Sequence, residues 1–426
     1  VLHYRPMTLE LDKLTPDLEK MAQAAAANRQ AQLRRAEQLR RLVAERATDW
    51  PGIRAGLQKA EEAADPKYFR AAAPLSEDEP LDTPIPPPAP PEQATIIATD
   101  GSQIMPDRHA AWLYYLINIG VIVYNHGSGR APHVFTSPRI FYPNVEDDVT
   151  EDEPGFDKSQ VTIARDRAEI ETLADFADAW RSAPGPMLAL LDQRLLYWPM
   201  VGERGSADPI VAHWTEAMRR IHETGALLAG YIDRPGKRSV VTMLQTLLDE
   251  PDMDWKALGK RPVGNELTDA GLYATLLGPG DRSPIFADIS PANKRFAEES
   301  PDIEVCFFYL NAGSSNILLD GELDPLGEAR AVARVDIPRW VAEDKAAVAA
   351  VHGLIYDQCR IQIGYPYALT RADELAVVGR DDEANLGNMI DLAMQRAGVS
   401  GSRTAKQSGK DFARGGRRPH RMGRYR

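Results

Sequence analysis

The chain of 426 residues is long enough for one large or two ordinary globular domains, and its 43% hydrophobic and 26% charged residues are typical of such proteins. No stretch reaches about 18 uncharged apolar residues, and the first residues lack the basic-then-apolar pattern of a secretory signal, so membrane-spanning and secreted classes are not expected. The net charge of −12 argues at first against a nucleic-acid partner.

A helical arm is predicted over residues 1–73. Ala, Leu, Glu, Gln and Arg dominate residues 8–62, apolar residues recur at helical spacing, and Thr15-Pro16 supplies an N-cap followed by proline. Residues 74–93 contain eight prolines, which exclude a helix or a central strand. We therefore expect a linker between the arm and a body formed by residues 94–400.

The body begins with strand patterns. Residues 95–99 form a β-branched apolar run that ends at Asp100-Gly101-Ser102, which we interpret as a strand entering a turn. The apolar block at residues 110–124 predicts one or two further strands with a break at Gly120.

The rest of the body continues an alternation of helix and strand patterns, which indicates a mixed α/β sheet with helices packed on it. An acidic loop is expected at residues 141–158, and residues 239–244 fit either a strand or a helix. The predicted helices cover residues 159–180, 207–230, 267–277, 339–362 and 369–378, and the predicted strands cover residues 186–191, 284–289 and 303–310.

The charge is unevenly distributed, because residues 403–426 contain nine Lys or Arg and a single acid. We expect this tail, residues 401–426, to be disordered when free and to suit a phosphate backbone or an acidic protein. A merely solubilising tail is the alternative. The two cysteines, Cys306 and Cys359, lie in apolar patterns without metal-site spacing and are interpreted as buried free thiols in a reducing, cytoplasmic compartment.

Three acids stand where a metal site could form: Asp100 and Asp192 at strand ends, and Glu169 on the helix before the second of these strands. Such acids can converge over a sheet, and a cluster of them is unfavourable unless divalent cations neutralise it. Carboxylate oxygens suit Mg²⁺ or Mn²⁺, and two such ions roughly 4 Å apart would activate a water and stabilise the leaving oxygen in phosphodiester hydrolysis.

Each acid also has a purely structural interpretation. An Asp before Gly-Ser is often a turn residue, Asp192 could cap the following helix, and Glu169 could belong to a solvated helix face with its charged neighbours. The histidines lack zinc-site spacing, and no phosphate-loop or nucleophile-elbow motif occurs. A nucleotide-driven motor or a serine hydrolase is therefore not expected.

A series of segments between about residues 94 and 378 resembles, in order and spacing, the successive blocks of the NurA family of DNA-end-processing nucleases. The segments are ATDGSQ, RDRAEIETLA, LALLDQRLL, AGYIDRPGKRSVV, GDRSPIF, VCFFYL, ARVDIPRW and IGYPYALTRADELAVV. The resemblance implies an RNase H-like fold, similar to the PIWI domain of Argonautes. It also implies manganese-dependent cleavage of single- and double-stranded DNA from 5′ ends, dimers, and a partnership with the hexameric translocase HerA.

Carried over by position, the resemblance implies metal-binding roles for Asp100, Glu169 and Asp192. Glu171 is the alternative to Glu169, because this stretch is loosely patterned. Gln193 follows Asp192 where a glycine is usual.

A histidine that the family carries after its GYP block is replaced here, since the pair is Ala372-Asp373. Asp373 can ligate a cation, but it cannot donate a proton as an imidazolium would at neutral pH. The resemblance also implies that Tyr365 positions the substrate, with a packed tyrosine as the alternative. Weaker phosphate-binding or site candidates are Arg234, Lys237, Arg238 and Asp288, whereas Phe307, Phe308, Tyr309, Trp198 and Trp340 are interpreted as packing residues.

The resulting prediction is a two-metal deoxyribonuclease, a 5′–3′ exonuclease and single-strand endonuclease acting in DNA end resection and double-strand break repair. Two Mn²⁺ or Mg²⁺ ions would be bound by Asp100, Glu169, Asp192 and Asp373, and the partners would be DNA, a HerA-like ATPase and a second copy of the chain. The first alternative is a catalytically weak or inactive adaptor that docks on such an ATPase, motivated by the lost histidine. A third hypothesis is a related enzyme that prefers RNA or hybrid duplexes.

Overall fold

The computed structural model describes residues 11–107, 110–143, 158–197, 208–248, 254–256, 258, 267–313, 332–362 and 364–399. Most of the predicted acidic loop, Trp198 and the basic tail lie outside these residues. Two compact units are formed, each from several segments of the chain. Unit 1 is drawn from residues 1–91, 192–196 and 227–367, and unit 2 from residues 92–191, 197–226 and 368–426.

The strands of unit 2 run in the order β5-β2-β3-β4. β2 (Ala94–Ile104), β3 (Tyr115–His126) and β4 (His133–Phe141) form an antiparallel meander, whereas β5 (Met187–Leu191) is parallel to β2. The predicted mixed α/β sheet is therefore confirmed. An antiparallel meander followed by a helix and a strand parallel to the first is the chain path expected of an RNase H-like fold.

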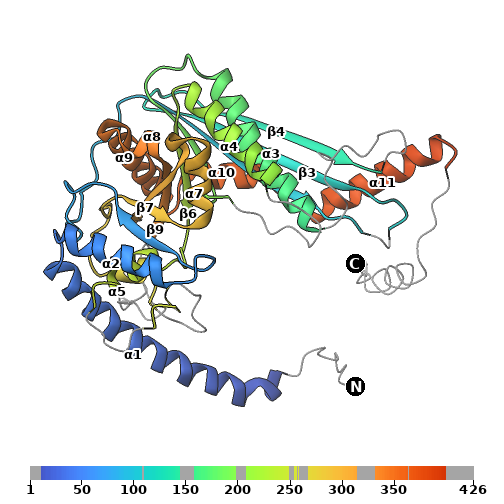
Figure 1. Cartoon of the computed structure of the whole chain (residues 1–426). Helices are drawn as coiled ribbons and strands as arrows, with labels where there is room; N and C mark the ends of the chain where they lie inside the picture. The colour runs from blue at the N-terminus through green and yellow to red at the C-terminus, as the bar shows by residue number, and fades with distance from the viewer. Residues whose placement is uncertain are drawn as a thin grey trace, which may run out of the picture. The chain divides into compact units, whose positions relative to one another are not determined.

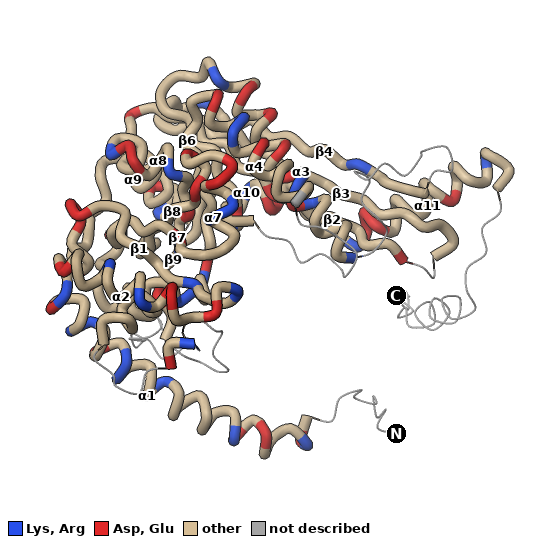
Figure 2. Tube along the Cα trace, viewed as in Figure 1, with Lys and Arg blue, Asp and Glu red and all other residues tan. Residues whose placement is uncertain are grey.

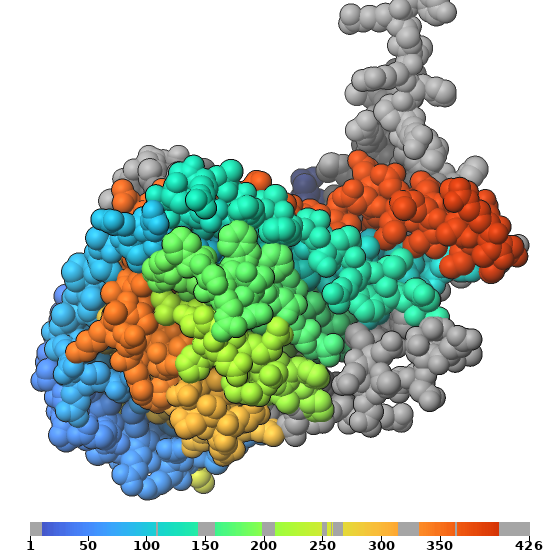
Figure 3. Space-filling view, turned by 90° about the horizontal axis from the view of Figure 1, so that it is seen from above, coloured from blue at the N-terminus to red at the C-terminus, as the bar shows by residue number. Residues whose placement is uncertain are grey.

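Helices pack on both faces of the unit 2 strands. α3 (Lys158–Ala179) covers one face of β2, and α4 (Asp208–Glu223) lies beside α3 (Figure 1). α10 (Tyr367–Ala376) contacts the other face of β2 and β3 through its residues from Ala368 onward. α11 (Arg380–Arg396) has no buried residue and lies at the surface, in orange-red (Figure 3).

The strands of unit 1 run in the order β1-β7-β8-β9-β6, and β1–β7, β7–β8, β8–β9 and β9–β6 all pair antiparallel. These strands are β1 (Ala71–Pro74), β6 (Leu227–Ile232), β7 (Phe286–Ile289), β8 (Val305–Asn311) and β9 (Val332–Pro338). The helices of this unit are η1 (Leu11–Leu14), α1 (Thr15–Glu45), α2 (Trp50–Ala63), α5 (Ser239–Gln245), α6 (Asp269–Tyr273), α7 (Pro291–Glu299), η2 (Pro301–Ile303), α8 (Arg339–Ala342) and α9 (Lys345–Ile361).

The predicted N-terminal helical arm is present as α1 and α2. Asp49 caps α2 by accepting a hydrogen bond from the Gly52 amide, and acidic and basic residues are interspersed along α1 (Figure 2). The apolar residues of the second half of α1, such as Leu39 and Val43, are buried in the core of unit 1, whereas Leu18 and Met21 in its first half are exposed. The boundaries of arm, linker and body stay predictions.

Phe307, Phe308 and Tyr309 on β8 are fully buried, which confirms their interpretation as core. Tyr309 stacks on Tyr273, with 5.1 Å between ring centroids. Cys306 and Cys359 are buried free thiols, as predicted, and burial raises the pKa of each to about 12. None of the described helices is long and apolar enough to span a membrane.

Two predictions about the first strands were wrong. β2 does not enter a turn at Asp100-Gly101-Ser102 but runs on to Ile104, because β3 pairs with it along its whole length. β3 is not broken at Gly120, which pairs with Asp100 in the middle of the strand.

Several helix boundaries also differ from the predictions. The helix expected at residues 207–230 ends at Glu223, and residues 227–232 form β6 instead. The helix expected at residues 267–277 is limited to Asp269–Tyr273, whereas residues 239–244 belong to a helix, α5, which was one of the two predicted alternatives. The helix expected at residues 339–362 is two helices, because Asp344 caps the second by accepting from the Ala346 and Ala347 amides.

Candidate active site

Asp100 lies in the middle of β2, where its neighbours show which face it occupies. The Thr99 hydroxyl donates to the Glu169 carbonyl on α3, and the Ser102 hydroxyl donates to the Ala376 carbonyl on α10. Because successive side chains of a strand point to opposite faces, Asp100 shares the α10 face with Ser102. Gly101 faces α3.

Asp100 on β2 and Asp373 on α10 are close enough for the negative charge of Asp373 to act on the Asp100 carboxyl group and raise its pKa. Burial raises the pKa of Asp100 to about 6, against a hydrogen bond from the Gly101 amide that lowers it, and the negative charge of Asp373 raises it further. Two acids so near each other favour either a shared proton or a bound cation.

Gly120 allows α10 to come close enough for this interaction. A Cβ atom at residue 120 would lie 2.4 Å from the Ala372 carbonyl oxygen and 2.5 Å from the Ala376 nitrogen. The Asn118 amide, two residues earlier on β3, donates to the Ala376 carbonyl at 2.8 Å. The end of α10 is thus fixed directly above the strand pair that carries Asp100.

Glu169 approaches β2 from the α3 side. Its side chain is buried, and a Cβ atom at residue 101 would lie 2.6 Å from Glu169 Oε1. Since Gly101 has no side chain, the Glu169 carboxylate lies against the strand backbone at the residue next to Asp100. Glu171 points elsewhere and is half-exposed, paired with Arg167 at 3.3 Å.

Arg165 holds the acids of α3 in place. Its Nε lies 3.2 Å from Glu169 Oε1, its Nη2 lies 2.5 Å from Asp166 Oδ1, and its Nη1 donates to Gln103 Oε1 at 3.3 Å. Asp166 also accepts a hydrogen bond from the Tyr197 hydroxyl at 3.0 Å. Burial and the neighbouring Asp166 raise the pKa of Tyr197, so this phenol stays a donor.

Asp192 is the residue that directly follows the end of β5. The parallel register pairs Thr99 with Leu191, so the next residues of the two strands are Asp100 and Asp192. Asp192 is exposed. Asp192 belongs to unit 1 and Asp100 to unit 2, and a ligand set that includes all four acids stays a prediction.

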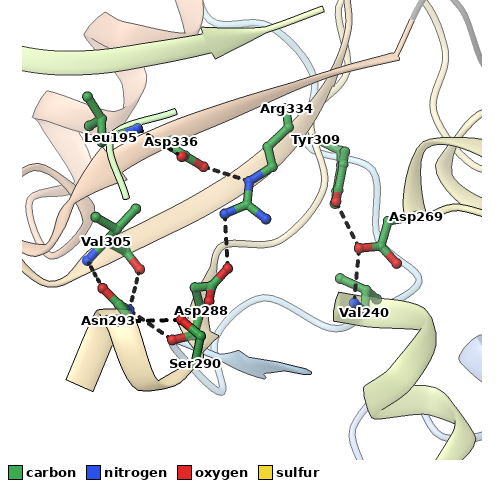
Figure 4. Close-up of polar contacts among 10 residues, drawn as sticks. All are labelled: Leu195, Val240, Asp269, Asp288, Ser290, Asn293, Val305, Tyr309, Arg334 and Asp336. Carbon is green, nitrogen blue, oxygen red and sulfur yellow. Dashed lines mark hydrogen bonds and ion pairs between the residues drawn. The ribbon is translucent and has the colours of Figure 1, made fainter. Parts of the chain in front are cut away.

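The segment after Asp192 is clamped within unit 1 by a buried ionic network (Figure 4). The Leu195 amide donates to Asp336 Oδ2 at 3.1 Å, and Arg334 Nε donates to Asp336 Oδ1 at 2.6 Å. Arg334 also donates to Asp288 at 3.2 Å and lies 3.8 Å above the Phe307 ring.

Gly230 contributes to the same clamp. It pairs with Asp336 across β6 and β9, and a Cβ atom at residue 230 would lie 2.3 Å from the Gln193 carbonyl oxygen. The chain that follows Asp192 therefore lies directly on β6. Asp288, a weak site candidate from the sequence, is instead an ion-pair partner of Arg334 in this structural network.

The predicted substrate-binding residues lie in unit 1. Lys237 is exposed, and desolvation of its amino group, together with the positive charges of Arg334 and Arg194, lowers its pKa against the opposing effect of Asp288. Arg238 donates to the Leu267 carbonyl at 2.9 Å, so it has a structural partner.

Tyr365 packs edge-on against Tyr231, with 5.4 Å between ring centroids, and is half-buried. Arg234 has a positive φ of 48°, and its Nε lies 3.6 Å from Asp233 Oδ2. Phosphate or substrate roles for Tyr365, Lys237 and Arg238 stay predictions.

Asp100 and Asp373 offer carboxylate oxygens on the α10 face of β2 and Glu169 offers them on the α3 face, and carboxylate oxygen is the donor type that hard divalent cations prefer. Within the part of the chain that the structure describes, no group of three or more His, Cys, Asp or Glu side chains is placed so that it could hold a metal ion. In the described conformation the Glu169 carboxylate forms an ion pair with Arg165.

Sequence reasoning missed Asp166 and gave Arg165 only a surface role. Asp166 is buried and precedes Glu169 by one helical turn, so the three-residue spacing was the available signal. The alternative interpretation of Glu169 as part of a solvated helix face is wrong, because Glu169 is 5% exposed, and it fits only the Arg167–Glu171 pair.

Comparison with known proteins adds a family assignment. The NurA domain model matches residues 94–378. The solved structure of the NurA nuclease from Sulfolobus solfataricus is similar over 74% of this chain and 87% of its own, with 12% identity and a TM-score of 0.46. The catalytic domain of human Endonuclease V is similar over 70% of this chain and 85% of its own, with 12% identity and a TM-score of 0.31. No curated protein matches the sequence.

Proposed function

The chain belongs to the NurA family of nucleases, and from this premise we propose that it is a metal-dependent deoxyribonuclease whose site is centred on Asp100. The observation that carries the proposal is the close packing of α10 on Gly120, the β3 partner of Asp100, which brings the negative charge of Asp373 near the Asp100 carboxyl group. Two neighbouring carboxyl groups are costly when both are ionised, and a divalent cation is a ligand that would relieve that cost.

Asp100, Asp373, Glu169 and Asp192 would hold the cations, which we infer to be two Mn²⁺ or Mg²⁺ ions. When bound, such ions supply the charge that activates a water and stabilises the leaving oxygen of the phosphodiester. Asp100 must be ionised to serve as a ligand, and its raised pKa means that this state is reached above about pH 6.

Residues of the chain would also bind and orient the DNA strand. Lys237 and Arg238 are the candidates for contacts with phosphates, and Tyr365 is the candidate for positioning the substrate. The clamp formed by Asp336 and Arg334 fixes the backbone that follows Asp192 and therefore supports a defined position for the Asp192 carboxylate. The predicted basic tail would add a sequence-independent attraction for DNA.

The test is cleavage of end-labelled linear DNA by the purified full chain, with and without Mn²⁺. Asp100→Ala is expected to abolish cleavage and to leave the thermal unfolding midpoint near the wild-type value. Asp381→Ala, which removes an exposed acid from α11, is the matched control and should cleave normally. The site assignment is wrong if folded Asp100→Ala cleaves as fast as the wild type.

The same assay addresses polarity and substrate class. We infer 5′–3′ exonuclease and single-strand endonuclease activity in DNA end resection and double-strand break repair. Parallel reactions on DNA, RNA and hybrid strands of one sequence would reveal an RNA-directed enzyme, and labels at either end would report the direction of digestion.

The second candidate function is an adaptor with weak or no activity, and Asp373 at the family's histidine position favours it. We infer that a HerA-like hexameric ATPase is the partner in either case and that the chain forms a homodimer. A protein that binds neither Mn²⁺ nor Mg²⁺, yet stimulates the ATPase activity of such a partner, would be an adaptor. Sedimentation of the full chain reports the dimer.

A further inference from the structure

We propose that Arg194 and Lys237 form a phosphate-binding site within unit 1, which holds one phosphate group of a DNA strand next to the buried Arg334 network. The inference rests on the proposed function, because it takes DNA as the substrate. It adds Arg194, which the sequence did not single out, to the residues that would bind the strand, and it requires no metal ion.

Arg194 lies on a short segment whose backbone is fixed on both sides. The carbonyl oxygen of Gln193 lies against Gly230 of β6, where a Cβ atom would come within 2.3 Å of it. The Leu195 amide donates to Asp336 Oδ2 at 3.1 Å. The Arg194 side chain between these two contacts is exposed, so its guanidinium is available to a ligand from a backbone that is held in place.

Lys237 belongs to the loop that follows β6. Its carbonyl oxygen accepts a hydrogen bond from the Asp269 amide at 2.9 Å, which fixes the backbone of the loop. Its side chain is exposed, and it is close enough to Arg194 and Arg334 for their positive charges to act on its amino group. Two exposed cations from segments far apart in the sequence are therefore neighbours within unit 1.

The buried acids beside Lys237 do not neutralise this group of cations. Asp288 and Asp336 attract the Lys237 amino group. Both carboxylates already bind Arg334, at 3.2 and 2.6 Å (Figure 4). The cations Arg194, Lys237 and Arg334 thus outnumber the two carboxylates, and like charges brought together are unfavourable unless an anion joins them.

The hydrogen bonding of Arg334 is a second, independent observation. This side chain is 4% exposed, and its Nη1 atom is buried without a hydrogen-bond acceptor among the described residues. A buried charged donor that lacks an acceptor is costly. A phosphate oxygen at the site would supply the missing acceptor, directly or through one ordered water.

Phosphate is the anion that suits these donors. A guanidinium presents a planar fork of N–H groups that matches two phosphate oxygens, and an ammonium adds a compact positive charge. Arg238, the residue after Lys237, donates to the Leu267 carbonyl at 2.9 Å and is not part of the site. The site therefore consists of one arginine and one lysine that present exposed cationic groups.

The experiment measures binding of a fluorescein-labelled single DNA strand to the full chain by anisotropy, in EDTA and over a series of salt concentrations. Arg194→Gln should weaken binding by about fivefold and reduce the slope of log affinity against log salt by about 0.7, as expected for one phosphate contact on a single strand. Arg360→Gln is the matched control, because it removes an exposed arginine from the last turn of α9 in the same unit. It should bind within about twofold of the wild type with an unchanged slope.

Two results would overturn the site. Either Arg194→Gln binds with the affinity and slope of the wild type, or Arg360→Gln loses as much as Arg194→Gln does, so that net charge alone explains the effect. Both differ from failure of the proposed function, because binding in EDTA is measured separately from the Mn²⁺-dependent cleavage that Asp100→Ala should abolish. If the wild type does not bind the strand, the phosphate site and the DNA substrate are both wrong.

Two further variants separate a shared site from general attraction. Arg194→Lys keeps the charge and loses the planar fork, so it should bind more tightly than Arg194→Gln and keep the wild-type slope. Lys237→Gln should resemble Arg194→Gln, and the double variant should lose less than the product of the two single losses, because both residues hold one phosphate. Losses that multiply would show independent contacts and overturn the shared site. All these variants replace exposed side chains, so their thermal midpoints should match that of the wild type.

Discussion

Asp100 on β2 pairs with Gly120 on β3, and α10, the helix that carries Asp373, packs directly on that glycine. This contact exists because Gly120 leaves no Cβ atom between β3 and α10. Gly120 on β3 therefore allows α10 to bring Asp373 close to Asp100 on β2.

Glu169 and Glu171 should behave differently when each is neutralised. We expect Glu169→Gln to lower Mn²⁺-dependent DNA cleavage by about 10²-fold or more, because its buried carboxylate lies against the strand that carries Asp100. Glu171→Gln breaks only a half-exposed pair and should cleave at the wild-type rate. The reverse ranking, measured on end-labelled DNA, would move the metal site to the other face of α3.

Substitution of Gly120 should displace α10. A Cβ atom at this residue would meet backbone atoms of Ala372 and Ala376, so Gly120→Ala should lower the free energy of unfolding by about 1–3 kcal/mol and reduce cleavage beyond the loss of folded protein. Gly387→Ala is the control: this residue lies within α11 with open space around it, and alanine should stabilise the helix by up to about 1 kcal/mol. Urea unfolding with cleavage at matched folded fraction measures both. Equal stability and activity of the two variants would contradict the role of Gly120.

Asp336 should act on activity through the segment that follows Asp192. Asp336→Asn removes one of the two carboxylates that neutralise buried Arg334 and leaves only Asp288, so we expect a loss of about 3 kcal/mol of unfolding free energy. The weakened acceptor for the Leu195 amide should also lower kcat at temperatures where the variant is folded. Asp302→Asn, at an exposed acid of η2, is the control. A folded Asp336→Asn with wild-type kcat would show that the clamp has no part in catalysis.

Asp269 should make stability depend on pH. It accepts hydrogen bonds from the Val240 and Val241 amides and the Tyr309 hydroxyl, and burial raises its pKa from 3.8 to about 6. The folded state therefore binds the proton more tightly than the unfolded state, so this group's contribution to unfolding free energy falls as pH rises from about 4 to about 6.

The size of this effect follows from the shift, at roughly 1–3 kcal/mol for a change of about two pKa units in a fully buried group. The measurement is urea unfolding of the wild type and Asp269→Asn across this pH range. The wild type should lose stability relative to the variant up to about pH 6 and run parallel to it above. Parallel curves throughout would show that Asp269 does not titrate in this range.

Strongly patterned elements could be predicted from the sequence. α3 and β5 agree with the predictions to within about two residues, because a long amphipathic repeat and a compact apolar run are unambiguous signals. β4 was missed because most of its side chains are exposed and it contains Pro138, both of which are features of an edge strand rather than a buried one.

β6 was absorbed into a predicted helix because apolar residues continue through residues 226–232. Gly225, with a φ of +79°, ends the turn after α4, and a glycine beyond a helical pattern was the available stop signal. α11 was also missed, and none of its residues is buried.

The candidate site was predictable in part. Asp100 and Glu169 stood out as acids near an apolar strand and helix, but the sequence could not show that β2 continues past Asp100 or that Gly101 opens the strand to Glu169. The buried contacts of Arg165 and Asp166 could not be predicted, because tertiary packing decides which face of a helix is covered and therefore which charged side chains are buried.

Thr99 pairs with Leu191 in the parallel register, so Asp100 and Asp192 each come one residue after this pair. Deletion of a single residue from β5 would shift Asp192 by one position in the register and point its side chain to the opposite face of the sheet, while the hydrophobic composition of the strand would hardly change. Related sequences should therefore vary freely in the kinds of apolar residue used in this strand but keep their number, and any gap in an alignment should fall in the surrounding loops.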